Sequence, residues 1–349
     1  MKIAFFVNDL DREEEHFATT ILANEALRRG HSVCYVAPTD FAFMPDDSMQ
    51  IHARFAPKKK FANYMAFWKA MHDGKRADAR WIDIRELDVL MLRNDPSIDA
   101  IDRPWAESVG VQFGRIAAER GVLVLNDPDG LAIATNKLYF QSFPAALRAP
   151  TLIAKDSDAI KQFAKKHNSK IVLKPLRGSG GQSVFLVGSE TAANLNQMID
   201  AVSRDGYVIA QAYVPAARAG DIRLFLMNGV PLMHKGKYAA FRRVSAAGDV
   251  RSNIHAGGSA QAAEIGETEL RVAELVRPKL LQDGMFLVGL DIVGDKILEI
   301  NVFTPGGLRN AGKFTGVRFS TAILKSIERK IAIRDEFPGR FGNRELAVL

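Results

Sequence analysis

The chain has 349 residues, enough for two domains with a sizeable core, and its hydrophobic content of 47% and charged content of 25% are those of an ordinary globular protein. The net charge of +7 comes from scattered basic residues without an aromatic-basic signature, so nucleic acid is not an expected partner, and a small anionic substrate explains the surplus equally well. No apolar run reaches the roughly 18 residues of a membrane span, so no membrane partner is expected, and the single cysteine, Cys34, excludes an intramolecular disulfide and suits a reducing cytoplasm.

The first third of the chain alternates strand and helix patterns. Continuous apolar runs predict strands at 2–8, 31–37, 87–92 and 122–125, helical periodicity predicts helices at 17–29 and 101–120, and the span 38–86 is polar and irregular. The loop Arg93-Asn94-Asp95-Pro96 follows the third strand, at the carboxyl end where open α/β sheets bind ligands. No G-x-G-x-x-G sequence follows the first strand, so a dinucleotide site is not indicated. We expect an open parallel α/β substrate-binding domain at 1–125.

From about residue 126 the pattern is that of an α+β domain. Helices are predicted at 137–146, 156–166, 190–203, 267–283 and 320–331, and strands at 151–154, 170–174, 207–211, 222–227 and 231–237, with a further strand ending at Val187. The segment 238–258 lacks periodicity and is long for a passive connection, which predicts a mobile binding loop. We expect a second domain at 126–332, with a subdomain at about 137–212, and a polar C-terminal tail at 333–349.

The stretch Phe286–Gly307, FLVGLDIVGDKILEINVFTPGG, reads as a β-hairpin with two possible registers. A two-residue loop at Gly294–Asp295 would pair Asp291 with Leu298, a carboxylate against an apolar side chain. A three-residue loop pairs Asp291 with Glu299 instead. Because a slip of one residue flips every side chain to the other face, the hydrophobic pattern favours the three-residue loop.

The three-residue loop separates the two faces of the hairpin. It puts Ile292 opposite Leu298 and Gly289 opposite Asn301. The aliphatic face then carries Val288, Leu290, Ile292, Leu298, Ile300 and Val302. The other face carries Asp291, Glu299 and Asn301, and two carboxylates with an amide oxygen form a hard-cation site, where Mg²⁺ shares its ligands with substrate phosphates. A hairpin with a solvated outer face has the same pattern.

Three upstream features suit a bound nucleotide. Lys174 ends a strand and precedes the turn 178–181, whose backbone N–H groups can wrap phosphate oxygens, although such turns are as common in plain hairpins. The strand 207–215 breaks at Gln211-Ala212-Tyr213-Val214, where apolar walls and exposed backbone groups suit an adenine ring. Arg223 lies within an apolar strand and needs an anionic partner, which is either a ligand or a structural salt bridge.

These pieces occur in a recognisable order. The motifs are ATNKLYF around Lys137, IVLKPLRGSGG around Lys174, AQAYVP, GDIRLF, RSNIHAGG and GLDIVGDKILEINVFTP. Together they resemble the ATP-grasp superfamily, and within it the bacterial glutathione synthetases. The resemblance extends from the first strand to about Ile331 and is densest from Lys170 to Pro305.

The resemblance implies a ligase that activates a carboxylate as an acyl phosphate and joins it to an amine, with ATP between two α+β subdomains. The residues it implies for ATP are Lys137, Lys174, Gly178, Ser179, Gly180, Gly181, Gln211, Tyr213 and Val214. Asp291, Glu299 and Asn301 would hold two Mg²⁺ ions, with Mn²⁺ as the alternative metal. Arg223 would stabilise the developing charge, as the electrostatics of phosphoryl transfer also require. Arg243 and Arg251, eight residues apart, would bind substrate carboxylates from the 238–258 loop.

The chain departs from the glutathione synthetase pattern in its peptide-binding half. Thr304, Pro305 and Gly306 replace a Thr-Ser-Pro-type turn and are the remaining candidates for peptide contact. A Lys-Asp-Ser element is absent around 17–20, and Ala212 replaces a polar hinge residue. We therefore expect γ-glutamylcysteine and glycine to be accepted without necessarily being the best pair. A related amino-acid or γ-glutamyl ligase and a nucleotide-binding module without turnover remain alternatives, and both a monomer and a homo-oligomer remain open.

Overall fold

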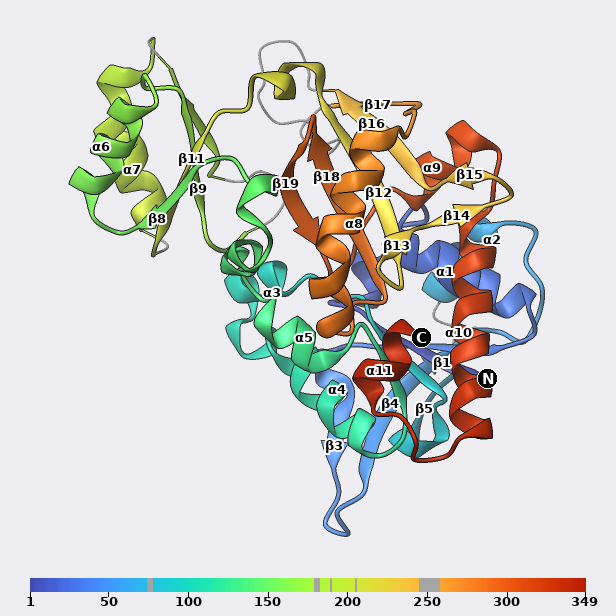
Figure 1. Cartoon of the computed structure of the whole chain (residues 1–349). Helices are drawn as coiled ribbons and strands as arrows, with labels where there is room; N and C mark the ends of the chain where they lie inside the picture. Colours follow the sequence, from blue (N-terminus) through green and yellow to red (C-terminus); the bar gives the residue numbers. More distant parts are fainter. Residues whose placement is uncertain (74–77, 179–182, 189, 205, 245–257) are drawn as a thin grey trace.

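The computed structural model of the chain describes residues 1–73, 78–178, 183–188, 190–204, 206–244 and 258–349. Within these residues one sheet lies in the N-terminal third, a small sheet with two helices stands apart as a separate lobe, and a larger sheet fills the body between them (Figure 1). We refer to them as the N-terminal sheet, the small lobe and the central sheet. We propose domain boundaries near residues 125 and 332, as the sequence pattern suggests.

The N-terminal sheet has the strand order β3-β4-β2-β1-β6-β7, with β5 paired to β4. Its parallel core consists of β1 (Lys2–Phe6), β2 (Ser32–Val36), β6 (Val89–Leu92) and β7 (Leu123–Leu125). These strands are almost fully buried because helices cover the sheet, which is why their sequences are continuous apolar runs. The first helix, α1 (Ala18–Arg28), ends beside Gly30, whose φ of +88° is the left-handed conformation common after helix ends.

Two predictions for this region are wrong. The span expected to be irregular contains η2 (Pro38–Asp40), β3 (Phe41–Phe43), β4 (Met49–Phe55), α2 (Tyr64–His72), β5 (Asp78–Asp83) and η3 (Ile84–Glu86). Strand β4 alternates buried and half-buried residues, a period-2 signal that the sequence carries as MQIHARF. The helix predicted at 101–120 is α3 (Pro96–Asp102), η4 (Pro104–Ala106) and α4 (Val109–Glu119), since Pro104 has no N–H to continue the first helix.

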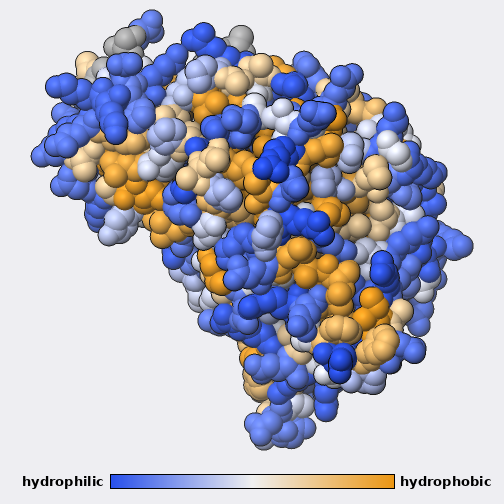
Figure 2. All heavy atoms as spheres, in the orientation of Figure 1, coloured by the Kyte–Doolittle hydropathy of each residue, from blue (hydrophilic) through white to orange (hydrophobic). Residues whose placement is uncertain are grey.

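The small lobe is an antiparallel sheet of order β10-β9-β11-β8. Its strands are β8 (Thr151–Ala154), β9 (Ile171–Pro175), β10 (Phe185–Val187) and β11 (Val208–Ala212). Helices α6 (Ser157–Lys166) and α7 (Leu195–Ser203), the latter preceded by η7 (Ala192–Asn194), pack on this sheet and give the lobe its own apolar core. On the face shown in Figure 2 the outer surface of this lobe is mostly hydrophilic, and apolar residues gather where the lobe meets the body.

The connection into the small lobe is not the α-helix predicted at 137–146. After α5 (Pro128–Ile133) the chain forms two 3-10 turns, η5 (Lys137–Ser142) and η6 (Ala145–Leu147). Pro144 separates them, and Asn136 caps the first by accepting the Leu138 N–H. Lys137 therefore stands at the start of a short rigid segment.

The central sheet has the order β17-β16-β12-β18-β19, and helix α8 (Glu267–Gln282) covers one face of it (Figure 1). Its strands are β12 (Asp221–Met227), which follows η8 (Pro215–Ala219), β13 (Val230–Pro231), β16 (Ala240–Val244), β17 (Ser259–Gln261), β18 (Leu287–Val293) and β19 (Lys296–Asn301). The single strand predicted at 231–237 is instead split among β13, β14 (Met233–His234) and β15 (Lys237–Tyr238), because Gly236 turns the chain with a φ of +71°.

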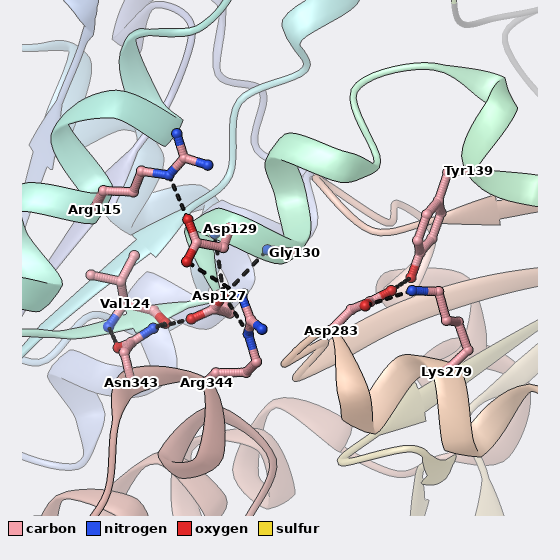
Figure 3. Close-up of polar contacts among 10 residues, drawn as sticks. All are labelled: Arg115, Val124, Asp127, Asp129, Gly130, Tyr139, Lys279, Asp283, Asn343 and Arg344. Carbon is pink, nitrogen blue, oxygen red and sulfur yellow. Dashed lines mark hydrogen bonds and ion pairs between the residues drawn. The ribbon is translucent and has the colours of Figure 1, made fainter. Parts of the chain in front are cut away.

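The chain ends in helices, where we expected only a polar tail at 333–349. Helices α9 (Leu308–Thr315) and α10 (Phe319–Glu336) are followed by α11 (Asn343–Val348). Asn343 bonds both backbone groups of Val124 at the free edge of β7, at 2.7 and 3.0 Å, and donates to Asp127 at 2.9 Å (Figure 3). A side-chain amide thus takes the place of a missing neighbouring strand. None of the helices described is long and apolar enough to cross a membrane.

Candidate active site

A cavity of about 370 Å³ lies where the N-terminal sheet, the small lobe and the central sheet meet. Its lining includes Lys137, Lys174, Gly178, Gln211, Tyr213, Val214, Arg243, Asp291, Glu299, Asn301 and Thr304, all of them predicted site residues. Arg223, Pro305 and Gly306 are not part of this lining. Ser179, Gly180, Gly181 and Arg251 fall outside the described residues, and Arg251 was predicted in a loop of which 245–257 is not described.

The hairpin of β18 and β19 brings the predicted metal ligands together by a route that we did not predict. The turn has two residues, because Val293 pairs with Lys296 and Gly294 has a φ of +57°. A β-bulge between Asp291 and Ile292 then shifts the register by one residue, so that Asp291 pairs with Glu299 and Gly289 with Asn301 as expected.

The three-residue loop and the Ile292–Leu298 pair are therefore wrong. Ile292 faces Ile297, which is buried, and Leu298 is the bulged residue, which lines the cavity instead of joining the aliphatic face. The bulge reconciles a two-residue turn with the register that the hydrophobic pattern requires. It leaves Asp291 and Glu299 as direct cross-strand neighbours on the cavity side.

Asp291 lies in the centre of a buried charge network. Arg223, its neighbour on β12, donates Nε to Oδ1 at 2.5 Å and Nη2 to Oδ2 at 3.0 Å. Arg243 of β16 approaches Oδ2 at 2.6 Å and also pairs with Asp221 at 2.5 Å. Burial would raise the pKa of Asp291, but the attraction of Arg223 and Arg243 outweighs burial and holds this pKa below its usual value.

This network revises the expected places of the two arginines. Arg243 was predicted in a mobile loop, yet it lies in a strand with only 12% of its side chain exposed, and it faces the cavity. Arg223 lies beside Asp291 on the neighbouring strand, outside the cavity lining, and also donates to the carbonyl of Gly306 at 3.0 Å. Of the two, Arg243 is therefore the one placed to reach a ligand.

Two lysines face the β18–β19 hairpin across the cavity. Burial lowers the pKa of Lys174 to about 8, with Glu299 opposing this and Lys137 adding to it, and its ammonium donates to Gln211 at 3.1 Å. Burial also lowers the pKa of Lys137, which donates to the carbonyl of Gly178 at 2.5 Å. Neither ammonium has an anionic hydrogen-bonding partner among the described residues, so both are ready for a ligand anion.

Hydrogen bonds from neighbouring residues hold Lys174, and the segment that carries Lys137, in place. Gln211, predicted beside adenine, donates to Thr151 at 3.2 Å while accepting from Lys174, so its side chain positions that lysine. The Tyr139 hydroxyl, two residues after Lys137, donates to Asp283 at 2.8 Å, and Lys279 of α8 pairs with the same carboxylate at 2.7 Å (Figure 3). The segment that carries Lys137 is thereby tied to the central sheet's helix.

A second buried arginine, Arg93, follows β6, and the sequence placed it in a ligand-side loop without indicating a role for it. Its guanidinium donates to the carbonyls of Phe303 and Pro305 and to Thr19 Oγ1, each at 3.4 Å, and the residue is 4% exposed. The turn after β19 is therefore held from the N-terminal domain by Arg93 and from the central sheet by Arg223. The position of Arg93 at the carboxyl end of a parallel strand was the available signal.

Comparison with known proteins identifies the family. The family model "Prokaryotic glutathione synthetase, N-terminal domain" matches residues 1–132, and "Prokaryotic glutathione synthetase, ATP-grasp domain" matches 136–316. The chain belongs to the prokaryotic glutathione synthetase family. It is 30% identical to the glutathione synthetase of Vibrio parahaemolyticus over 309 residues, 88% of this chain and 91% of that protein. For the Synechocystis glutathione synthetase the identity is 27% over 336 residues, 95% of this chain and all of that protein.

Solved structures agree on the fold of this family member. D-cycloserine synthetase matches with a TM-score of 0.61 at 16% identity, over 93% of this chain and 99% of that chain. The D-alanine–D-alanine ligase of Coxiella burnetii matches with a TM-score of 0.56 at 11% identity, over 96% of both chains. The fold is ATP-grasp, as predicted, and the chain is a ligase of the class that forms C–N bonds.

Proposed function

We propose that this family member is a glutathione synthetase, which uses ATP to join γ-glutamylcysteine to glycine through an acyl phosphate in the cytoplasm. The observation that supports this most is the cavity itself. Two half-buried lysines without anionic hydrogen-bonding partners among the described residues face two neighbouring carboxylates of one hairpin, in a chain whose two segments match both domains of that family. Such an arrangement suits a triphosphate bound with its metal ions.

The hairpin residues fit Mg²⁺ in kind and in place. Asp291, Glu299 and Asn301 would hold two ions with ATP, or Mn²⁺ in their stead. Glu299 has no hydrogen bond or ion pair to any described residue, whereas Asp291 is engaged by Arg223, by Arg243 and, at 3.3 Å, by the Asn301 amide. Bound there, the metal would neutralise phosphate charge. Arg243 lines the same cavity and would be available to a phosphate once Asp291 held a cation.

The other cavity residues have complementary tasks. Lys137 and Lys174 bind phosphate oxygens, while Tyr213, Val214 and the hinge backbone border the adenine and Gln211 keeps Lys174 in place. Arg243 faces the charge that develops as the acid's carboxylate attacks the γ-phosphate, and Arg223 fixes Asp291 and the Gly306 carbonyl behind it. The amine then attacks the acyl phosphate, expels phosphate and gives up a proton as the amide forms.

The experiment is an assay of ADP and amide product in a panel that varies the acid and the amine separately. We expect turnover with γ-glutamylcysteine and glycine. Product only with another pair would favour a related ligase, for which the altered turn at Phe303–Gly306 is the specific observation. If none of the acids supports ADP release, the proposed ligase activity is overturned and a nucleotide-binding module without turnover is favoured.

A further inference from the structure

The N-terminal domain contributes one carboxylate to the cavity that the proposed mechanism does not use. Asp95 lines the cavity together with Pro96 and Ser97, on the side contributed by the N-terminal sheet. Its charge reaches the ammonium of Lys137, as does that of Glu299. Asp95 therefore belongs to the active-site cavity, although it lies on a different domain from the metal-ligand hairpin.

The backbone of Asp95 is rigidly placed. Its N–H donates to Asn8 Oδ1 at 2.7 Å, and the Asn8 amide donates back to the Asp95 carbonyl at 2.8 Å. Asn8 is held in turn by Asp99 at 2.7 Å and by Arg103 at 2.7 Å. These contacts join the ends of β1 and β6, so the position of Asp95 is set by the sheet rather than by a free loop.

The carboxylate of Asp95 is only half used within the protein. Oδ1 accepts from the backbone N–H of Ser97 at 3.0 Å and from its hydroxyl at 2.6 Å, which makes Asp95 the N-cap of α3. Oδ2 has no hydrogen bond or ion pair in the part of the chain that the structure describes. Capping thus orients the group and leaves one oxygen available at the cavity.

The charge of Asp95 decides what this oxygen can bind. The carboxylate of Asp95 would repel the phosphates of ATP, so Asp95 is not a phosphate-binding group. The lysines proposed to bind phosphate lie on other segments. Its natural partner is a cation, and both proposed substrates carry a primary ammonium group. A charge-assisted hydrogen bond from an ammonium to a preorganised carboxylate gives affinity and orientation together.

We propose that Asp95 binds the ammonium group of a substrate amino acid and so determines which substrates are accepted. This inference rests on the proposed function and assigns a specificity residue to it. The ammonium is either the α-amino group of the γ-glutamyl acid or the amine of the acceptor, and the two sources can be separated by experiment. For the acceptor, the same contact would hold the amine until its proton is released for attack on the acyl phosphate.

The test compares wild type with Asp95→Asn, which keeps the cap because Asn and Asp are equally good N-caps but removes the charge. We expect the KM for one substrate to rise about tenfold or more, as for one lost hydrogen bond between charged groups, with the KM for ATP unchanged. Asp102→Asn is the matched control. It lies in the same helix with half of its side chain exposed and pairs only with Arg12 among the described residues, so its KM values should stay those of wild type.

Glutarylcysteine, which lacks only the α-amino group of γ-glutamylcysteine, identifies the source. If wild type prefers γ-glutamylcysteine over it and Asp95→Asn does not, the acid's ammonium is bound. If instead the KM for glycine alone rises, the acceptor's ammonium is bound. Unchanged KM values for both substrates, or a rise in the KM for ATP, would overturn the inference. A thermal melt checks folding, and should the Asn variant unfold, Asp95→Glu, which keeps the charge, must show a smaller rise in the same KM.

Failure of the Asp95 inference can be distinguished from failure of the proposed function. Failure of that function appears in the wild type as absence of product with γ-glutamylcysteine and glycine. Failure of the Asp95 inference appears only as equality between variant and wild type while the wild type is active.

Discussion

Lys174, which is half-buried, and Asp291, which is buried, are ionisable groups of the cavity, and the protein compensates their charges to different degrees. Asp291 faces two guanidinium groups, so it stays ionised in spite of burial. Lys174 has only the amide oxygen of Gln211 as a hydrogen-bonding partner among the described residues, and burial lowers its pKa to about 8. The charge of Asp291 is therefore balanced within the free protein, whereas that of Lys174 is left to be balanced by a bound anion.

ATP binding should therefore weaken as the pH rises through about 8. The free protein loses the Lys174 proton near that pH, whereas bound phosphate favours the ammonium, so binding takes up a proton and affinity falls by up to about tenfold per pH unit above it. Calorimetric titration with ATP between about pH 7 and 9.5 measures this. Lys174→Arg, which stays protonated, should show a flatter profile. Parallel profiles for the two proteins would contradict the assignment.

At the scale of elements, the β18–β19 hairpin shows what a sequence pattern can and cannot predict. Period-2 alternation correctly paired Asp291 with Glu299, because only that pairing separates the faces. The pattern could not locate the bulge at Leu298, since a bulge changes the register without changing composition. In the same way the helical prediction at 137–146 overlooked Pro144, whereas β8 was predicted with its observed bounds.

The turn that follows this hairpin depends on a contact between distant segments. Arg93 donates from its two terminal nitrogens to the carbonyls of Phe303 and Pro305 in this turn. The fork of a guanidinium can reach both carbonyls, whereas the single ammonium of a lysine cannot. Arg93→Lys should therefore loosen the turn and lower kcat/KM for the acid by about tenfold to a hundredfold, since a misplacement near 1 Å can cost about a hundredfold. The KM for ATP should not change. Initial-rate kinetics against each substrate are the measurement.

Arg120→Lys is a suitable control for this substitution, because Arg120 bonds an exposed loop carbonyl at 2.7 Å away from the cavity. Equal losses against ATP and the acid would show that Arg93 supports the whole fold and not the turn.

Across the whole molecule, the two ends of the chain are bound to one another. Helix α10 lies beside α1 (Figure 1), and Glu328 of α10 accepts from Arg29 at 2.5 Å and contacts His31 at 2.7 Å. Separately, Asn343 of helix α11 bonds Val124 of β7 and Asp127 (Figure 3). The sequence predicted a tail at 333–349 because sequence patterns are local, and contacts with partners 219 and 246 residues away leave no local signal.

The Glu328 contacts predict how stability depends on pH. The hydrogen bond from Arg29 holds the pKa of Glu328 below its ordinary value of 4.5. A carboxyl group with a lowered pKa in the folded state stabilises that state above its unfolded pKa, and this contribution disappears as the pH falls through the folded value. Glu328→Gln should therefore lower Tm at pH 7 by a few degrees at most, because the pair is partly exposed, and the difference should shrink as the pH falls below 4.5 and vanish below the lowered pKa of Glu328. Glu336→Gln, an exposed change at the end of the same helix, should leave Tm unchanged. A Tm difference for Glu328→Gln that persists in acid would mean that packing, rather than charge, joins the two ends of the chain.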